Sequence, residues 1–156
     1  MKFNVNQNDL QQSLGYCQGV IEKRSTLPIL SNILLDASNS KLKIIATDLD
    51  LIFINVIKNV EILQEGKTTT TSSIMYDIVR KFNSGKKINF NQTSDNKIQL
   101  ESEKSIFNLN CISASEFPVT EENFSSSDFS IKSKELLKLL NKCKFSISND
   151  ETRHYL

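Results

Sequence analysis

The chain carries one pattern twice, and this repeat limits the folds that it can adopt. Six apolar or small positions recur 126 residues later in the same order, and Thr26 and Leu30 recur as Thr152 and Leu156. The six pairs are Phe3/Phe129, Val5/Ile131, Leu10/Leu136, Leu14/Leu140, Cys17/Cys143 and Ile21/Ile147. Each pair falls where a strand followed by a helix would bury it, so the repeat is one of core positions. We therefore expect one complete module and the opening of a second.

The repeated module has the length of an ordinary protein domain and can bury a core. The residues beyond it amount to one strand, one helix and part of a second strand, which is too little for a core of their own. A stretch rich in Ser, Glu and Asn follows Phe117 and Pro118, as expected of a linker. The predicted organisation is a first domain at 1–120, a linker at 121–127 and an incomplete second domain at 128–156.

Alternating apolar residues separated by turn signals predict an α+β fold in which two helices pack on antiparallel sheets. The predicted module is a β-α-β-β-β arrangement used twice, and a truncated second copy of the module follows it. Turns are expected at Asn39-Ser40 and at 48–50. Strands are expected at 2–6, 29–37, 41–47, 51–62, 87–92, 97–102 and 105–111.

Two helices are predicted from apolar residues at helical spacing. The first is expected to be capped by Asn8 or Asp9, and the second by Ser72 or Ser73. The inward residues predicted for the first helix are Leu10, Leu14, Cys17 and Ile21. Those predicted for the second helix are Ile74, Ile78, Val79 and Phe82.

The outward faces of both predicted helices are polar and carry little acid. The first face has Gln7, Gln11, Gln12 and Gln18, with Lys23 and Arg24 just beyond the helix. The second face has Tyr76, Asp77, Arg80 and Lys81. Such a face can lie against nucleic-acid phosphates without specifying a sequence. A plain solvated helix face has the same pattern, and the residues alone favour that interpretation.

Charge and cysteine content exclude several classes of function. A net charge of +1 provides no global basic field for nucleic acid. Three cysteines without CxxC spacing and one histidine predict no metal site and indicate reduced thiols in a cytosolic protein. The N-terminal residues lack the apolar segment of an export signal, and no apolar run has membrane-spanning length.

The strongest candidate for catalysis is the carboxylate pair Asp48 and Asp50. A metal or acid–base site would need converging further ligands, whereas the neighbouring segments are apolar strands, so an Asp-rich turn is favoured. His154 is the single imidazole, and neither a GxSxG motif nor a glycine-rich phosphate loop is present. The sequence therefore predicts no catalytic residue, no metal and no cofactor.

Several segments resemble one protein family along the whole chain. They are similar to the bacterial DNA polymerase III beta subunit, the sliding clamp, and the segments at 24–35 and 46–51 are the most specific. The matching segments are 1–3 (MKF), 24–35 (RSTLPILSNILL), 46–51 (ATDLDL), 77–80 (DIVR), 115–118 (SEFP) and 145–156 (FSISNDETRHYL).

The resemblance implies a non-catalytic processivity factor. Members of the family are head-to-tail homodimers with three modules per subunit, closed into a ring with helices inside and sheets outside. The ring encircles double-stranded DNA independently of sequence, and a clamp loader and the replicative DNA polymerase are its partners. The implied location is the bacterial cytoplasm, at the nucleoid. This chain would hold the first module and the start of the second, and we do not expect it to close a ring alone.

The resemblance also assigns roles to individual residues. The implied DNA-binding residues are Arg24, Arg80, Asn149, His154 and Tyr155. The implied edge of a pocket for partner peptides is formed by Arg153 and Leu156. The implied subunit interface is formed by Lys104, Ile106, Phe107 and Leu109 on an edge strand.

The chain departs from the family pattern at two places. Ser73 and Ile74 stand where relatives often carry a basic pair, and the aromatic pair of the DNA loop is here His154-Tyr155. Two other functions remain open. One is a stand-alone interaction module that pairs with a full-length clamp through the same edge. The other is a small enzyme that uses Asp48 and Asp50 with a divalent metal.

Overall fold

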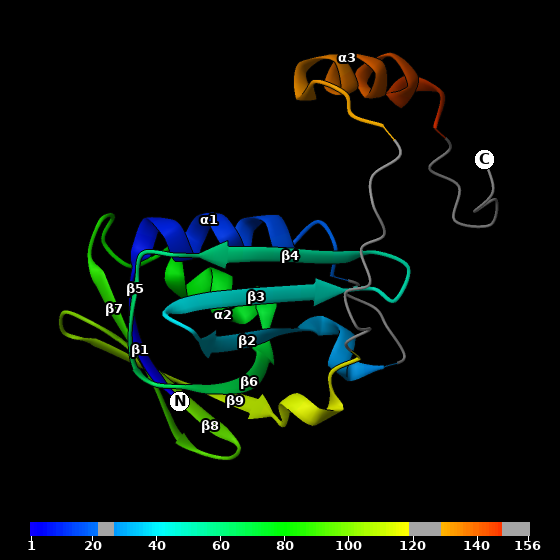
Figure 1. The fold of residues 1–156 in the computed structure, drawn as a ribbon. Coiled ribbons are helices and arrows are strands. Elements are labelled where there is room, and N and C mark those ends of the chain that lie inside the picture. Colours follow the sequence, from blue (N-terminus) through cyan, green and yellow to red (C-terminus); the bar gives the residue numbers. More distant parts are fainter. Residues whose placement is uncertain (22–26, 119–128, 148–156) are drawn as a thin grey trace. The chain divides into compact units, whose positions relative to one another are not determined.

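A computed structural model describes residues 1–21, 27–118 and 129–147 of the chain (Figure 1). The chain divides into two units, Met1–Val119 and Thr120–Leu156, each of which is described by itself. The helices are α1 (Gln7–Cys17), α2 (Ser72–Val79) and α3 (Ser133–Cys143), with short 3-10 turns η1 (Pro28–Ser31), η2 (Ala114–Glu116) and η3 (Lys144–Ser146). The strands are β1 (Lys2–Asn6), β2 (Asn32–Ser38), β3 (Lys41–Thr47), β4 (Ile52–Ile57), β5 (Val60–Gln64), β6 (Gly66–Thr71), β7 (Lys87–Ser94), β8 (Lys97–Ser102) and β9 (Ser105–Ile112).

The nine strands of the first unit form an antiparallel sheet in the order β4-β3-β2-β6-β9-β8-β7-β1-β5. The order contains two similar blocks. In the first block β2, β3 and β4, which follow α1, are joined by β6, which precedes α2; in the second block β7, β8 and β9, which follow α2, are joined by β1, which precedes α1. The ninth strand, β5, pairs with β1 at the end of the sheet. The predicted α+β class with helices on antiparallel sheets is confirmed. The strand order also shows that the two halves of the module, each with one helix, have similar topology. The sequences of the two halves show no matching positions.

The strand predictions needed three corrections. The segment at 51–62 is two strands, β4 and β5, because the chain turns at Lys58-Asn59. The segment at 29–37 begins as the η1 turn after Pro28 and becomes extended only at Asn32. The third correction is β6, which the sequence analysis missed because its run of threonines has no apolar alternation.

Strand β6 is nevertheless buried. Thr68, Thr69 and Thr70 are each at most 1% exposed. Their branched side chains suit a strand, and two hydroxyls are satisfied across the sheet: Thr69 Oγ1 donates to Ile112 O at 2.9 Å and Thr70 Oγ1 to Asn110 O at 3.1 Å. The backbone pairing of β6 with β9 covers only Thr69 with Ile112 and Thr70 with Cys111. Side-chain hydroxyl groups therefore add hydrogen bonds to the short β6–β9 pairing that joins the two blocks of strands.

The helix starts also differ from the prediction. Asn6 caps α1, because its Oδ1 accepts the Asn8 N–H at 2.9 Å, so neither Asn8 nor Asp9 is the cap. Helix α2 follows Thr71, which makes no side-chain cap bond, and it starts at Ser72. Ile74 was predicted to point inward but is 51% exposed, whereas Met75 is fully buried.

One main core fills the first unit. The rings of Phe3 and Phe90 stack with centroids 4.4 Å apart, and both side chains are fully buried. Leu10, Leu14 and Cys17 of α1 are also fully buried, as predicted. Phe117 covers a second, smaller cluster with Leu34 and Ile45.

In the second unit, α3 confirms the helix of the second copy. The preceding residues 129–132 form no strand, which corrects the expected repeat of β1. A strand needs a hydrogen-bonded neighbour, and the described part of this unit contains no strand with which residues 129–132 could pair. The apolar side chains of α3 remain about half exposed.

Replacing Phe3 with Ala is expected to lower the free energy of unfolding by about 3–5 kcal/mol, because it removes a stacked ring from the core. Urea denaturation followed by circular dichroism measures the change. Phe145→Ala is the matched control, since that ring is 89% exposed, and should alter stability by less than about 0.5 kcal/mol. Equal effects of the two substitutions would contradict this description of the core.

Candidate functional site

Helices α1 and α2 lie side by side and antiparallel, and two glutamines of α1 join them at opposite ends. At the start of α1, Gln7 Nε2 donates to the carbonyl of Val79, the last residue of α2, at 2.8 Å. Just after α1, Gln18 Nε2 donates to Ser72 Oγ, at the start of α2, at 2.8 Å. These two bonds link the two ends of the helix pair (Figure 1).

The sequence analysis placed both glutamines on the outward face, and for Gln7 this was wrong. Gln7 is 1% exposed, and its Nε2 also donates to Gln11 Oε1 at 2.7 Å. The Gln7 Oε1 atom is buried and has no hydrogen-bond partner among the described residues. Gln18 is half-buried. Of the four glutamines predicted on the outward face, only Gln12 is exposed.

A shallow groove runs between the helices. It is lined by Asn8, Gln11, Gln12, Gly15, Tyr16 and Tyr76. The Tyr76 ring faces Gly15, where a Cβ would lie 3.7 Å from its Cε2 atom, in ordinary van der Waals contact. The groove therefore presents amide and phenol groups and no charged side chain. The sequence analysis did not predict this groove.

Arg80 is the predicted DNA-binding residue that the structure describes. It forms the C-cap of α2, and its guanidinium lies 3.1 Å from Asp77 Oδ1, with both side chains about half exposed. Its Cζ atom also lies 5.9 Å from the centroid of the Tyr76 ring. Arg80 and the exposed Lys81 thus place cationic groups at one end of the helix pair.

The other predicted DNA-binding and pocket residues fall outside the described residues. They are Arg24, Asn149, Arg153, His154, Tyr155 and Leu156. Their assigned roles stay predictions.

The predicted subunit interface lies on β9. Over residues 105–110 this strand pairs with β8 on one side, and its pairing with β6 on the other side starts only at Cys111. Ile106 is 57% exposed and Phe107 is 36% exposed, so both are available at this edge. Leu109 is only 6% exposed and belongs to the core, where it can support the edge but presents little surface.

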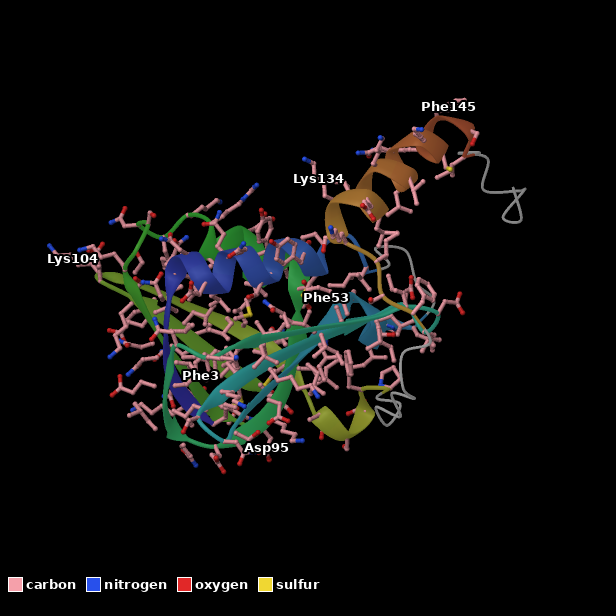
Figure 2. All side chains as sticks on the ribbon, turned by 45° about the horizontal axis from the view of Figure 1, so that its top comes forward. Phe3, Phe53, Asp95, Lys104, Lys134 and Phe145 are labelled. Atoms are coloured by element: carbon pink, nitrogen blue, oxygen red, sulfur yellow. The ribbon has the colours of Figure 1, made fainter. Side chains whose placement is uncertain are left out.

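Lys104 lies at the exposed tip of the β8–β9 hairpin (Figure 2). Its neighbour Glu103 has a positive φ of 53° and links the hairpin to the segment between α2 and β7. Glu103 accepts from Asn83 Nδ2 at 2.6 Å and pairs with Lys86 at 3.1 Å. The hydrogen bonds from Lys86 and Asn83 and the charge of Lys86 hold the pKa of the Glu103 carboxyl below its ordinary value. The Glu103 carboxyl is therefore ionised at neutral pH, as its pairing with Lys86 requires.

The carboxylate pair at 48–50 forms a turn. Asp48 Oδ1 accepts the backbone N–H groups of Asp50 at 3.1 Å and Leu51 at 2.7 Å. Leu49 has a positive φ of 84°, and its N–H is bound by Thr47 Oγ1 at 3.0 Å. Asp48 is thus engaged with the backbone, as in an Asx-turn, which supports the turn interpretation over a metal site.

Nothing in the described ranges brings metal ligands together, since no group of three or more His, Cys, Asp or Glu side chains is suitably placed. Burial raises the pKa of the Cys17 thiol to about 12, so this cysteine is an inert core residue. None of the described helices is long and apolar enough to span a membrane.

A helix pair backed by an antiparallel sheet, with an open edge on β9, agrees with the comparisons with known proteins. The family model for the N-terminal domain of the DNA polymerase III beta subunit matches residues 1–121. The chain belongs to this family. The beta sliding clamp of Caulobacter vibrioides is 37% identical over 157 aligned positions, and that of Rickettsia felis is 31% identical over 156. Both alignments span the whole chain but only 42% and 41% of the relatives.

Solved structures of the family give the same result. A Caulobacter crescentus pol III beta structure superimposes with a TM-score of 0.90 at 37% identity, covering 100% of this chain and 42% of that one. A sliding clamp from Bartonella birtlesii, bound to griselimycin, has a TM-score of 0.91 at 34% identity and covers 99% of this chain and 41% of that one. The chain thus spans less than half the length of these family members.

Gln7→Ala is expected to lower the free energy of unfolding by about 1 kcal/mol, because the Val79 carbonyl loses the Gln7 donor, although it retains the Phe82 N–H at 3.2 Å. Thermal and urea denaturation measure the change. Gln12→Ala is the control, because it removes the same kind of side chain from an exposed position of the same helix. Its free energy of unfolding is expected to lie within about 0.5 kcal/mol of wild type. If both variants were equally stable, the glutamine link would contribute nothing to helix pairing.

Proposed function

We propose that the chain is the N-terminal part of a sliding clamp, a processivity factor that encircles duplex DNA and tethers the replicative polymerase. The observation that carries this proposal is the end-to-end match to proteins named beta sliding clamp. The whole protein would be a head-to-tail homodimer without catalytic activity of its own. It would act in the bacterial cytoplasm at the nucleoid, where a clamp loader places it on DNA.

The geometry of the first unit supports this proposal. The α1–α2 pair presents an amide-rich surface ending in Arg80 and Lys81, which can lie along phosphates without specifying a sequence. We assign this surface to the inside of the ring. Arg24, Asn149, His154 and Tyr155 would add DNA contacts, and Arg153 and Leu156 would form the edge of the pocket for partner peptides.

We also propose the domain organisation expected from the repeat, with a first clamp domain at 1–120, a linker at 121–127 and the start of a second domain at 128–156. Support comes from the burial of matching positions. Leu10 and Leu14 are fully buried, whereas Leu136 and Leu140 are 43% and 59% exposed. In a complete module, the strands and the helix that follow the first helix would cover these leucines.

The clamp proposal is tested with the native protein, recovered from its own cells with an antibody against this chain. We expect a polypeptide longer than this chain, in a dimer that stays on circular DNA and leaves it when the DNA is linearised. A ring that encloses DNA can slide off a free DNA end, whereas a protein that binds the DNA surface is not released by linearising the DNA. Equal retention on circular and linear DNA would contradict the proposal.

The subunit interface is proposed to use the open edge of β9 with Lys104, Ile106, Phe107 and Leu109. Ile106→Lys in the native protein is expected to weaken dimerisation at least tenfold, because it places a charge in an apolar contact (about 1.4 kcal/mol or more). Sedimentation equilibrium measures the change. Ile52→Lys, at a 41% exposed position of β4, is the matched control and should leave the dimer intact.

The same open edge favours a second candidate function, a stand-alone module that pairs with a full-length clamp. An exposed strand edge is a template for pairing with another chain. Mixing this 156-residue chain with a full-length clamp and separating the products by gel filtration tests this function. A discrete complex that Ile106→Lys abolishes would support it, and no complex would exclude it.

A further inference from the structure

Four aliphatic side chains are exposed at one end of strands β2, β3 and β4. Leu27, Leu49, Leu51 and Ile52 are 50%, 56%, 54% and 41% exposed. The η1 turn comes directly before β2, and the turn at 48–50 lies between β3 and β4. Because these strands are antiparallel neighbours, η1 and the turn lie at the same end of the sheet (Figure 1). We call the four residues the aliphatic patch.

A small buried cluster supports the elements that carry the patch. Leu34 and Ile45 are each 5% exposed and pack with Phe117, on the side of the sheet away from the main core. Ile29 and Ile54 pack against this cluster. Ile29 belongs to η1 and Ile54 to β4, so the cluster holds both elements in place. The aliphatic patch is therefore mounted on packed structure.

The backbone holds Leu49 in a conformation that leucine seldom adopts. Its φ of 84° lies in the left-handed region, which a residue with a Cβ atom disfavours. Thr47 Oγ1 accepts the Leu49 N–H, and Asp48 Oδ1 accepts the N–H groups of Asp50 and Leu51, so the turn is fixed on both sides. The exposed Leu49 side chain does not stabilise the core in return. Backbone strain beside exposed apolar groups is typical of a binding surface.

The repeat relates the patch to the pocket edge proposed for the second module. Shifting the register by 126 places Leu27 on Arg153 and Leu30 on Leu156, the two residues assigned above to that edge. Leu30 is 2% exposed, whereas Leu27 is half exposed. The first module therefore has a leucine at the position where the second has an arginine, and its equivalent of the pocket edge is entirely aliphatic.

We propose that the aliphatic patch is a separate peptide-docking site on the first module, which takes an extended segment of a partner protein with alternating aliphatic residues next to basic ones. Alternate side chains of an extended peptide point the same way and can cover the patch together. The basic preference follows from Asp50, which is exposed between Leu49 and Leu51. This inference rests on the proposed function, because it uses the pocket edge assigned to the second module.

The experiment measures binding of a fluorescein-labelled peptide, KKLSLSLS, to the full 156-residue chain by fluorescence anisotropy. The comparison peptide KKSSSSSS lacks the leucines, and EELSLSLS reverses the charges. We expect KKLSLSLS to bind at least about tenfold more tightly than KKSSSSSS, because its leucines are buried on binding. It should bind about threefold more tightly than EELSLSLS, because the charge contact with Asp50 is exposed to solvent.

Variants of the chain locate the binding site. Leu49→Asn removes the aliphatic group but keeps a residue type that tolerates a positive φ, and Leu51→Thr removes the neighbouring one. Each should weaken binding of KKLSLSLS at least about fivefold. Leu63→Thr, at a 53% exposed position of β5, is the matched control and should stay within about twofold of wild type. Asp50→Asn should remove the preference for KKLSLSLS over EELSLSLS, and circular dichroism checks the fold of each variant.

Four outcomes would overturn the inference. The first is equal binding of the three peptides, or equal weakening by Leu51→Thr and Leu63→Thr. The second is loss of binding in Leu156→Thr but not in Leu51→Thr, which would assign the peptide to the second module. The third is binding to this chain but not to the native protein, where the patch would then be covered.

The fourth outcome is a dimer of the chain that Leu51→Thr abolishes, without peptide binding, which would assign the patch to a second copy. The clamp proposal is decided separately, by comparing retention of the native protein on circular and linear DNA. That comparison has the same result whether or not the peptide binds.

Discussion

The direct passage from strand to helix is the constraint on which the first unit depends. Gln7 follows Asn6 and Ser72 follows Thr71, so no loop separates β1 from α1 or β6 from α2. Each helix is therefore positioned by the strand before it, and each of these strands is held within the block of strands that follows the other helix. This exchange brings α1 and α2 together as an antiparallel pair. The glutamine bonds at the two ends of the pair then adjust an arrangement that the sheet has already imposed.

The sequence predicted those elements whose physical cause is local. Strand β3 and hairpin β8–β9 follow from apolar alternation, and the Asn39-Ser40 turn is confirmed by positive φ values of 50° and 56° at the two residues. The fold class and the family followed from the repeat and from short specific segments. The helices of the first unit were found through Leu10, Leu14, Val79 and their neighbours.

The errors occurred where tertiary contacts override local pattern. Strand β6 is buried because it lies between β2 and β9, although its threonines have no apolar period. Gln7 is buried because Val79 offers it a carbonyl from a helix far away in the sequence. Met75 replaces Ile74 inside because the direction of α2 is set by β6. No single-sequence pattern contains these partners.

The order of the strands has a consequence for synthesis on the ribosome. All described core residues of the first unit lie between Met1 and Phe117. Strand β1 is made first but pairs with β5 and β7, whose last residue is Ser94. Phe3 and Val5 therefore wait for most of the domain to emerge before they are covered. The first strand of the chain is among the last to be enclosed, and a nascent chain must keep it from other contacts until then.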